Sequence, residues 1–218
     1  MHPTDTPARW FGVYPAKVND VQDPDKQGRV QVDLAITPEG GEERFRLWAR
    51  IATMMAGPGR GSWFIPEPGD EVLISFLGGD PRQPFVIGAL WNGKDAPPQT
   101  MDDHNNIRVI KTRSGHKLEF DDTDGSAKIT LTTPNGCELV LDDGGGGNLK
   151  LSHPAGSSME FDAAGNITIT AALNLNISAA QVDVQSAYSN FNGVTNHQVM
   201  ITPAVVGSTY TPGAGNIW

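Results

Sequence analysis

The chain has 218 residues, of which 38% are hydrophobic, and it contains 25 Gly and 16 Pro, so it can bury a core but has little room for long helices. Its 16 Lys and Arg against 25 Asp and Glu give a formal net charge of -9, which disfavours a protein that follows nucleic-acid backbones. The single cysteine, Cys137, excludes an internal disulfide, and no Cys or His spacing fits zinc, so we expect neither metal nor cofactor.

The first half predicts a short N-terminal arm over residues 1–9 and a five-stranded barrel over residues 10–93. Five runs of β-branched and aromatic residues are separated there by Gly, Pro and Asp. Val30 and Val32 alternate with polar residues, which indicates one buried and one solvated face. The apolar run over residues 72–77 instead predicts a strand covered on both faces. The number of strands and their loop lengths favour an OB-fold.

A linker is expected over residues 94–106, which are rich in Pro, Asp and Asn. Residues 107–200 then predict a needle-like β domain with three repeats of about 20 residues. Each repeat has a Gly, a strand with apolar residues three and five positions later, an Asp turn and a second strand. The apolar positions of the first strands are Leu118, Phe120, Leu139, Leu141, Met159 and Phe161.

After the third repeat, apolar residues recur with a period of two, which indicates a strand or a chain of short strands. Asp183 is the only charged residue between positions 164 and 218. A strand with one apolar face and no covering helix leaves backbone groups and side chains unsatisfied, so we expect copies of the chain to associate around a rotation axis. Besides the six repeat positions, the predicted core contains Ile167, Ile169, Leu173, Leu175 and Ile177.

No residues form a convincing catalytic site. No Gly-x-Ser-x-Gly motif is present, so we expect no enzymatic activity. The acidic pair Asp121 and Asp122 is interpreted as turn residues rather than as calcium ligands. His116 shares the strand parity of Leu118, so three copies would approach a common axis, but its place next to the turn at Gly115 favours a structural role over a metal ligand.

The segment from residue 201 to 218 predicts an interaction site at the tip. It ends a nearly uncharged stretch, and exposed aromatic clusters usually mark interfaces. The segment either binds a capping protein or folds back on its own assembly, and the sequence leaves both readings open. The tip residues are Tyr210, Pro212, Ile217 and Trp218.

The stretch SWFIPEPGDEVLISFLGGDPRQPFVIGALWNG, residues 62–93, resembles the OB-domain signature of phage baseplate assembly protein V and of VgrG-type spikes of contractile injection systems. The repeats are similar to the β-helical needle of the same family, and the ending YTPGAGNIW is similar to the tails of small spikes from phage-tail-like particles. The matching signature residues are Pro66, Pro68, Gly69, Asp70, Gly79, Asp80, Pro81 and Gly88.

The resemblance implies an all-β fold: an N-terminal OB-fold barrel followed by a C-terminal intertwined trimeric β-helix or β-prism needle. It implies a structural spike, a homotrimer seated on a separate hub protein, with a PAAR-like protein as a candidate cap and transient contact with a target membrane. Such a spike is made in the cytoplasm and assembled into a virion-like or extracellular contractile particle. The alternative is an OB-type module that binds oligosaccharide or single-stranded nucleic acid and carries a repetitive β tail.

Overall fold

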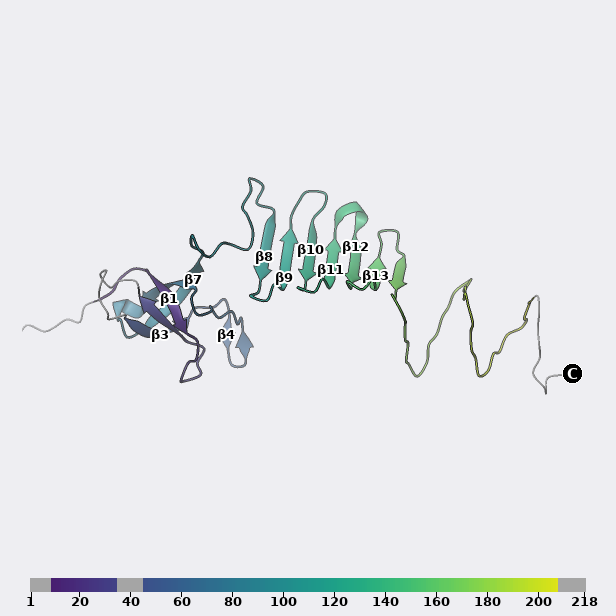
Figure 1. The fold of residues 1–218 in the computed structure, drawn as a ribbon, viewed down its shortest axis with the longest axis horizontal. Coiled ribbons are helices and arrows are strands. Elements are labelled where there is room, and N and C mark those ends of the chain that lie inside the picture. Colours follow the sequence, from purple (N-terminus) through teal and green to yellow (C-terminus); the bar gives the residue numbers. More distant parts are fainter. Residues whose placement is uncertain (1–8, 35–44, 208–218) are drawn as a thin grey trace, which may run out of the picture. The chain divides into compact units, whose positions relative to one another are not determined.

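The structure is a computed structural model that describes residues 9–34 and 45–207. The chain divides into two units, Met1–Ala172 and Leu173–Trp218. The first unit contains a closed five-stranded barrel and a seven-stranded sheet, drawn in purple to blue and in teal to green in Figure 1. Apart from two short 3-10 turns, all regular structure in the described residues is β, which confirms the all-β class.

The barrel is closed in the order β1, β2, β3, β7, β6. Neighbouring strands are antiparallel except β3 and β7, whose parallel pairing closes the barrel. A two-stranded hairpin is inserted between β3 and β6. The bounds are β1 Tyr14–Asp20, β2 Val30–Leu34, β3 Arg46–Ile51, β4 Ala56–Gly57, β5 Arg60–Gly61, β6 Glu71–Phe76, η1 Leu77–Gly79 and β7 Pro84–Leu90.

The barrel core is built from strand residues that point inward at every second position. In β2, Val30, Val32 and Leu34 are buried while the residues between them are half-buried, as the alternation predicts. Trp10 and Tyr14 cover the core with their rings 5.3 and 5.7 Å from that of Phe76. Each fully buried aliphatic or aromatic side chain contributes about 1.5–3 kcal/mol. The buried hydrophobic residues are Ala16, Val18, Val30, Val32, Leu34, Ala49, Val72, Ile74, Phe76 and Val86.

The prediction for residues 72–77 is wrong in one respect. Strand β6 buries Val72, Ile74 and Phe76, but Leu73 is only half-buried and Leu77 is exposed, so the strand has one buried face rather than two. The barrel encloses a single core, and nothing of the described chain covers the outer side of β6 as fully. An unbroken apolar run concealed the alternation, because Leu73 and Leu77 are apolar residues that point outward.

The seven-stranded sheet is an antiparallel meander in which each strand pairs with the next along the chain (Figure 1). Each of the three predicted repeats supplies two adjacent strands, β9 with β10, β11 with β12, and β13 with β14. The bounds are β8 Ile107–Lys111, β9 Lys117–Asp121, β10 Lys128–Thr132, β11 Glu138–Asp142, η2 Gly144–Gly146, β12 Asn148–Ser152, β13 Ser158–Phe161 and β14 Ile167–Thr170.

The repeat glycines form equivalent turns, each joining two successive strands at the same end of this sheet. Gly115, Gly136 and Gly156 have φ angles of +93°, +84° and +94°, a region that favours glycine. In each turn the glycine N–H donates to the carbonyl three residues earlier, at 2.9 Å. The Gly115 turn lies against Pro134 and the Gly136 turn against Pro154 of the following repeat. The repeated sequence therefore produces a repeated turn, which fixes the register of successive hairpins.

The second unit is extended over its described residues 173–207, which contain no strand or helix. The strand predicted from the period-two pattern is present only over Ile167–Thr170. An extended segment becomes a strand only when its N–H and C=O groups meet those of a neighbour, and the described part of this single chain offers none beyond β14. The intertwined trimeric needle accordingly stays a prediction.

Candidate functional site

One face of the seven-stranded sheet is lined almost entirely by apolar side chains. Residues paired across antiparallel strands lie on the same face, and so do residues two apart along one strand. The pairing Phe120 to Ile129 to Leu141 therefore begins a row, and Leu118 to Leu131 to Leu139 begins a second row on the same face. The apolar residues of the two rows are Phe120, Ile129, Leu141, Leu149, Phe161 and Ile167, and Ile110, Leu118, Leu131, Leu139, Leu151, Met159 and Ile169. Arg108 pairs with Phe120 and lies on the same face, at the β8 end of the first row.

This apolar face is uncovered in the single chain. Leu118, Leu139 and Met159 are half-buried, and the other members are exposed by between 36% for Phe161 and 59% for Ile167. Soluble monomers rarely expose such a continuous apolar surface, and an exposed patch of this kind usually marks an interface. We refer to these two rows as the apolar sheet face.

The opposite face of the sheet carries charged side chains, which are likewise paired from one strand to the next. Lys117 pairs with Glu119 at 2.9 Å, Lys150 with Glu160 at 3.8 Å, and Lys128 lies 3.9 Å from Asp121. Thr130 and Thr168 lie on this face as well, because they pair with Glu119 and Glu160 respectively. The sheet thus has one face suited to water and one suited to burial.

The predicted core positions of the three repeats all lie on the apolar sheet face, together with Ile167 and Ile169. Sequence reasoning missed the matching residues of the second strands, although KITLT and NLKLS carry the same alternation. The missed residues are Ile129, Leu131, Leu149 and Leu151, together with Ile110 of β8, which precedes the repeats. Leu173, Leu175 and Ile177 are exposed by 92%, 59% and 70%, and their predicted role in a core is untested. The predicted tip residues Tyr210, Pro212, Ile217 and Trp218 lie outside the described residues.

Most signature residues of the barrel lie in or next to its turns, and Gly88 lies in β7. Gly69, with φ +107°, follows Pro68 in the turn before β6, where the Asp70 carboxylate accepts a hydrogen bond from the Glu67 N–H at 2.8 Å. The same turn is tied to β1, since the Gly69 N–H donates to the Val18 carbonyl at 2.8 Å. Pro66, at the start of this turn, is half-buried. The signature therefore holds the turn before β6 against β1.

The remaining signature residues shape the turns around β7. Gly79 is buried and has φ +77°, and its carbonyl accepts a hydrogen bond from the Trp10 N–H at 2.9 Å. Asp80 and Pro81 complete the reversal that leads into β7. Gly88 lies just after Ile87, where the register of β6 and β7 shifts.

Two carboxylates of the barrel are held by arginines. Arg82 donates to Asp80 at 3.0 and 2.8 Å, and this side-chain hydrogen bonding lowers the pKa of Asp80 to about 2. Arg29 donates to Asp23 at 3.1 and 2.7 Å and holds the pKa of Asp23 well below its usual range. Asp23 also accepts from the backbone N–H groups of Asp25 and Gln27, so it organises the loop between β1 and β2. Sequence reasoning missed this role, although the DPDKQGR run, with its Asp, Pro and Gly, is typical of a turn.

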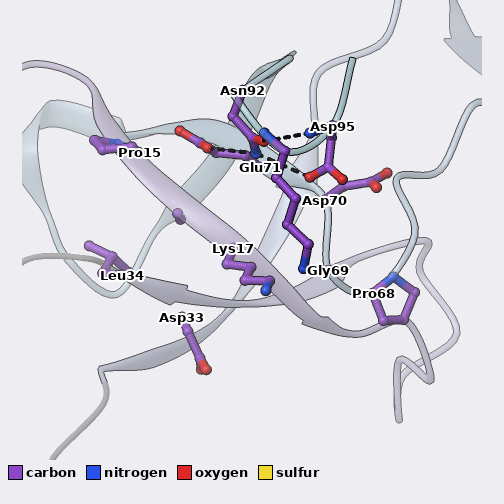
Figure 2. Close-up of a pocket in the computed structure, with 12 residues that line it drawn as sticks. Pro15, Lys17, Asp33, Leu34, Pro68, Gly69, Asp70, Glu71, Asn92 and Asp95 are labelled. Atoms are coloured by element: carbon purple, nitrogen blue, oxygen red, sulfur yellow. Dashed lines mark hydrogen bonds between the residues drawn. The ribbon is translucent and has the colours of Figure 1, made fainter. Parts of the chain in front are cut away.

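An open groove of about 710 Å³ lies at one end of the barrel (Figure 2). Figure 2 shows Asn92 between Glu71 and Asp95, and its side-chain amide donates to both carboxylates, at 3.2 and 3.1 Å. The charged residues lining the groove are Lys17, Asp33, Asp70, Glu71, Lys94 and Asp95. Four acidic and two basic side chains make this groove unfavourable for a phosphate backbone.

Within the described residues, no group of three or more His, Cys, Asp or Glu side chains is placed to hold a metal ion. Cys137 is a half-exposed free thiol in the turn after β10. Among the described residues, no helix has the length and apolar character needed to cross a membrane.

Comparison with known proteins relates this barrel to a defined group. The model of the type VI secretion system/phage-baseplate injector OB domain matches residues 14–91, which span all five barrel strands. The type VI secretion system spike proteins VgrG3 of Vibrio cholerae and VgrG2a of Pseudomonas aeruginosa are 34% and 32% identical over 124 and 122 residues. The chain is related to the VgrG-type spike proteins. This confirms the resemblance seen in residues 62–93.

The VgrG-type similarity covers a limited part of those relatives. The two alignments include 54% and 53% of this chain but only 12% and 14% of the VgrG proteins. A further relative, named actin cross-linking toxin VgrG1 of Vibrio cholerae, is 32% identical over 113 residues, which are 49% of this chain and 10% of the toxin. The activity in that name is a property of the toxin.

Proposed function

We propose that this chain is the structural spike of a contractile injection system or phage-tail-like baseplate, acting as a homotrimer without enzymatic activity. The apolar sheet face is the observation that carries the proposal. In a closed assembly its two rows face the other copies, and the charged face meets water. A trimer is the smallest closed arrangement of this kind, and the number three comes from the resemblance to trimeric spikes.

The proposed mechanism is mechanical. The barrels form a collar on a hub protein, and the sheets with the segment from Leu173 onward form a needle that points away from it. When a sheath contracts, the needle meets a target membrane transiently. Paired backbone groups within the needle resist bending, and the small number of charges beyond residue 164 lowers the cost of passing through lipid. A PAAR-like protein is the proposed cap.

The mass of the purified full-length chain tests the central part of this proposal. Light scattering coupled to size exclusion should give a mass close to three times 23.3 kDa. A stable monomer at micromolar concentration would overturn the needle, because the apolar sheet face would then have no partner.

An OB-type module for oligosaccharide or single-stranded nucleic acid is the alternative. The mixed charge of the groove in Figure 2 argues against nucleic acid, because cationic grooves are needed to follow its backbone. Salt-dependent binding of single-stranded DNA, or binding to a glycan array, by a monomeric chain would favour this alternative over the spike.

A further inference from the structure

A hydrogen-bonded hairpin between β3 and β6 is flanked by exposed apolar side chains. Strands β4 and β5 pair through Ala56 with Gly61 and Gly57 with Arg60. The Ser62 N–H donates to the Met55 carbonyl, and the Thr53 hydroxyl donates to the Ser62 carbonyl, both at 2.9 Å. These bonds hold both ends of the hairpin, so its side chains are presented in a defined arrangement.

Four large apolar residues are exposed around this hairpin. Met54, Met55, Trp63 and Phe64 are exposed by 91%, 54%, 75% and 65%. The Trp63 ring contacts Gly28, where an added Cβ would be only 3.1 Å from the ring. Exposed aromatic side chains are frequent anchors of protein interfaces.

A groove of about 560 Å³ runs beside these residues, and its charge differs from that of the whole molecule. Among the residues that the structure describes, Arg50 and Arg60 are the only charged ones that line it, although the chain carries a net charge of -9. None of the ion pairs found in the described residues involves either arginine. The Arg60 guanidinium lies over Gly57, so its position too is defined by the hairpin. Guanidinium groups bind carboxylates in a bidentate manner.

We propose that this hairpin groove docks an acidic segment of another protein, anchored by one large apolar side chain. Trp63, Phe64 and Met55 would receive the anchor, and Arg50 and Arg60 would bind carboxylates on either side of it. Within the proposed spike the hub is the natural source of this segment, and the inference depends on the proposed function only for that identity. Charge complementarity favours an acidic segment, because a basic or neutral segment would leave the guanidinium groups of Arg50 and Arg60 without carboxylate partners.

Fluorescence anisotropy of labelled synthetic peptides on the purified full-length chain tests the proposal. The first peptide alternates Glu and Asp around two central Leu residues, the second replaces Leu by Ser, and the third replaces the acidic residues by Lys. The first should bind, and its affinity should fall as salt is raised. Arg60→Glu should weaken this binding by at least about tenfold, and Met55→Glu, in the wall of the groove, should weaken it as well.

Matched variants separate the groove from general effects of charge. Lys94→Glu makes the same charge change in the other groove, and Met101→Glu alters a methionine that is 87% exposed outside the hairpin, so both should bind like the wild type. Failure of the first peptide to bind at millimolar concentration would overturn the proposal, as would equal binding of the Lys peptide or equal effects of the paired variants.

The mass of the Arg60→Glu variant distinguishes this inference from the proposed function. An unchanged mass, with peptide binding lost, supports docking of another protein. A lower mass would show that the groove is occupied by a second copy of this chain, which would overturn the inference. A monomeric wild type that binds the first peptide would overturn the trimeric needle and leave the docking site standing.

Discussion

Gly79 combines a positive φ with close neighbours, and both disfavour a side chain. Its φ is +77°, and an added Cβ would lie 3.1 Å from the Phe11 ring and 3.2 Å from the Cβ of Arg9. We expect Gly79→Ala to destabilise the barrel by about 1–3 kcal/mol, the usual cost of a residue held in a strained region. Urea unfolding followed by tryptophan fluorescence measures the change.

Gly88→Ala is the matched control for that substitution. Gly88 belongs to the same barrel signature, lies in β7, has no positive φ and has no atom within 4 Å of an added Cβ. Alanine there should be neutral or slightly stabilising, by up to about 1 kcal/mol, because it restricts the unfolded chain. Equal urea midpoints for the two variants would contradict the structural reason given for Gly79.

The lowered pKa of Asp80 leads us to expect a loss of folding stability in acid. Hydrogen bonds from Arg82 lower its pKa in the folded protein to about 2, compared with 3.8 for an unperturbed aspartate. The unfolded chain therefore binds protons first, so the stabilisation is complete above about pH 4 and is lost as the pH falls towards 2. The melting temperature of Asp80→Asn should fall less steeply over this interval than that of the wild type. Parallel curves for the two proteins would refute the role of the pair.

At the scale of elements, β11 provides adjacent positions on opposite faces of the sheet. Leu141 lies on the apolar sheet face, whereas Val140 lies beside Lys150 on the charged face. We expect Leu141→Asp to abolish the trimer, because it would bury an unpaired carboxylate in each copy. Val140→Asp should leave the mass in light scattering unchanged. A trimer that survives Leu141→Asp would show that this face is not the interface.

The sequence predicts elements well where the alternation of apolar residues, or a glycine in a turn, depends only on neighbouring residues in the chain. Val30, Val32 and Leu34 reveal the face of β2 that is buried, and each repeat glycine reveals a turn that the structure contains. The pattern fails for β6, because Leu73 is apolar yet points outward. It also fails for Asp23, which accepts five hydrogen bonds from Asp25, Gln27 and Arg29 that are set by the path of a loop. Periodicity indicates which residues share a face, but not what covers that face.

At the scale of the whole molecule, the segment 173–207 also shows that a pattern of side chains does not reveal the neighbour that a strand needs. Its period-two pattern suits a strand, yet the described chain contains no strand there, because pairing requires a neighbour. In the trimer we expect these residues to resist chymotrypsin, whereas the Leu141→Asp variant should be cut rapidly at sites such as Tyr188 and Phe191. Mass spectrometry of the fragments locates the cuts. Rapid cleavage of the wild-type trimer within 173–207 would show that the segment is not part of the assembly.

The paired strands of the repeats have a consequence for the length of the molecule. Each repeat adds two antiparallel strands. After each repeat the chain is therefore back at the same end of the strands, with its apolar side chains on the same face. Neighbouring strands are about 4.8 Å apart, so duplicating or deleting one repeat would change the sheet by about 10 Å and leave the register of every other strand intact. Length can therefore evolve in whole steps, by copying or losing a repeat, without any new pattern of side chains.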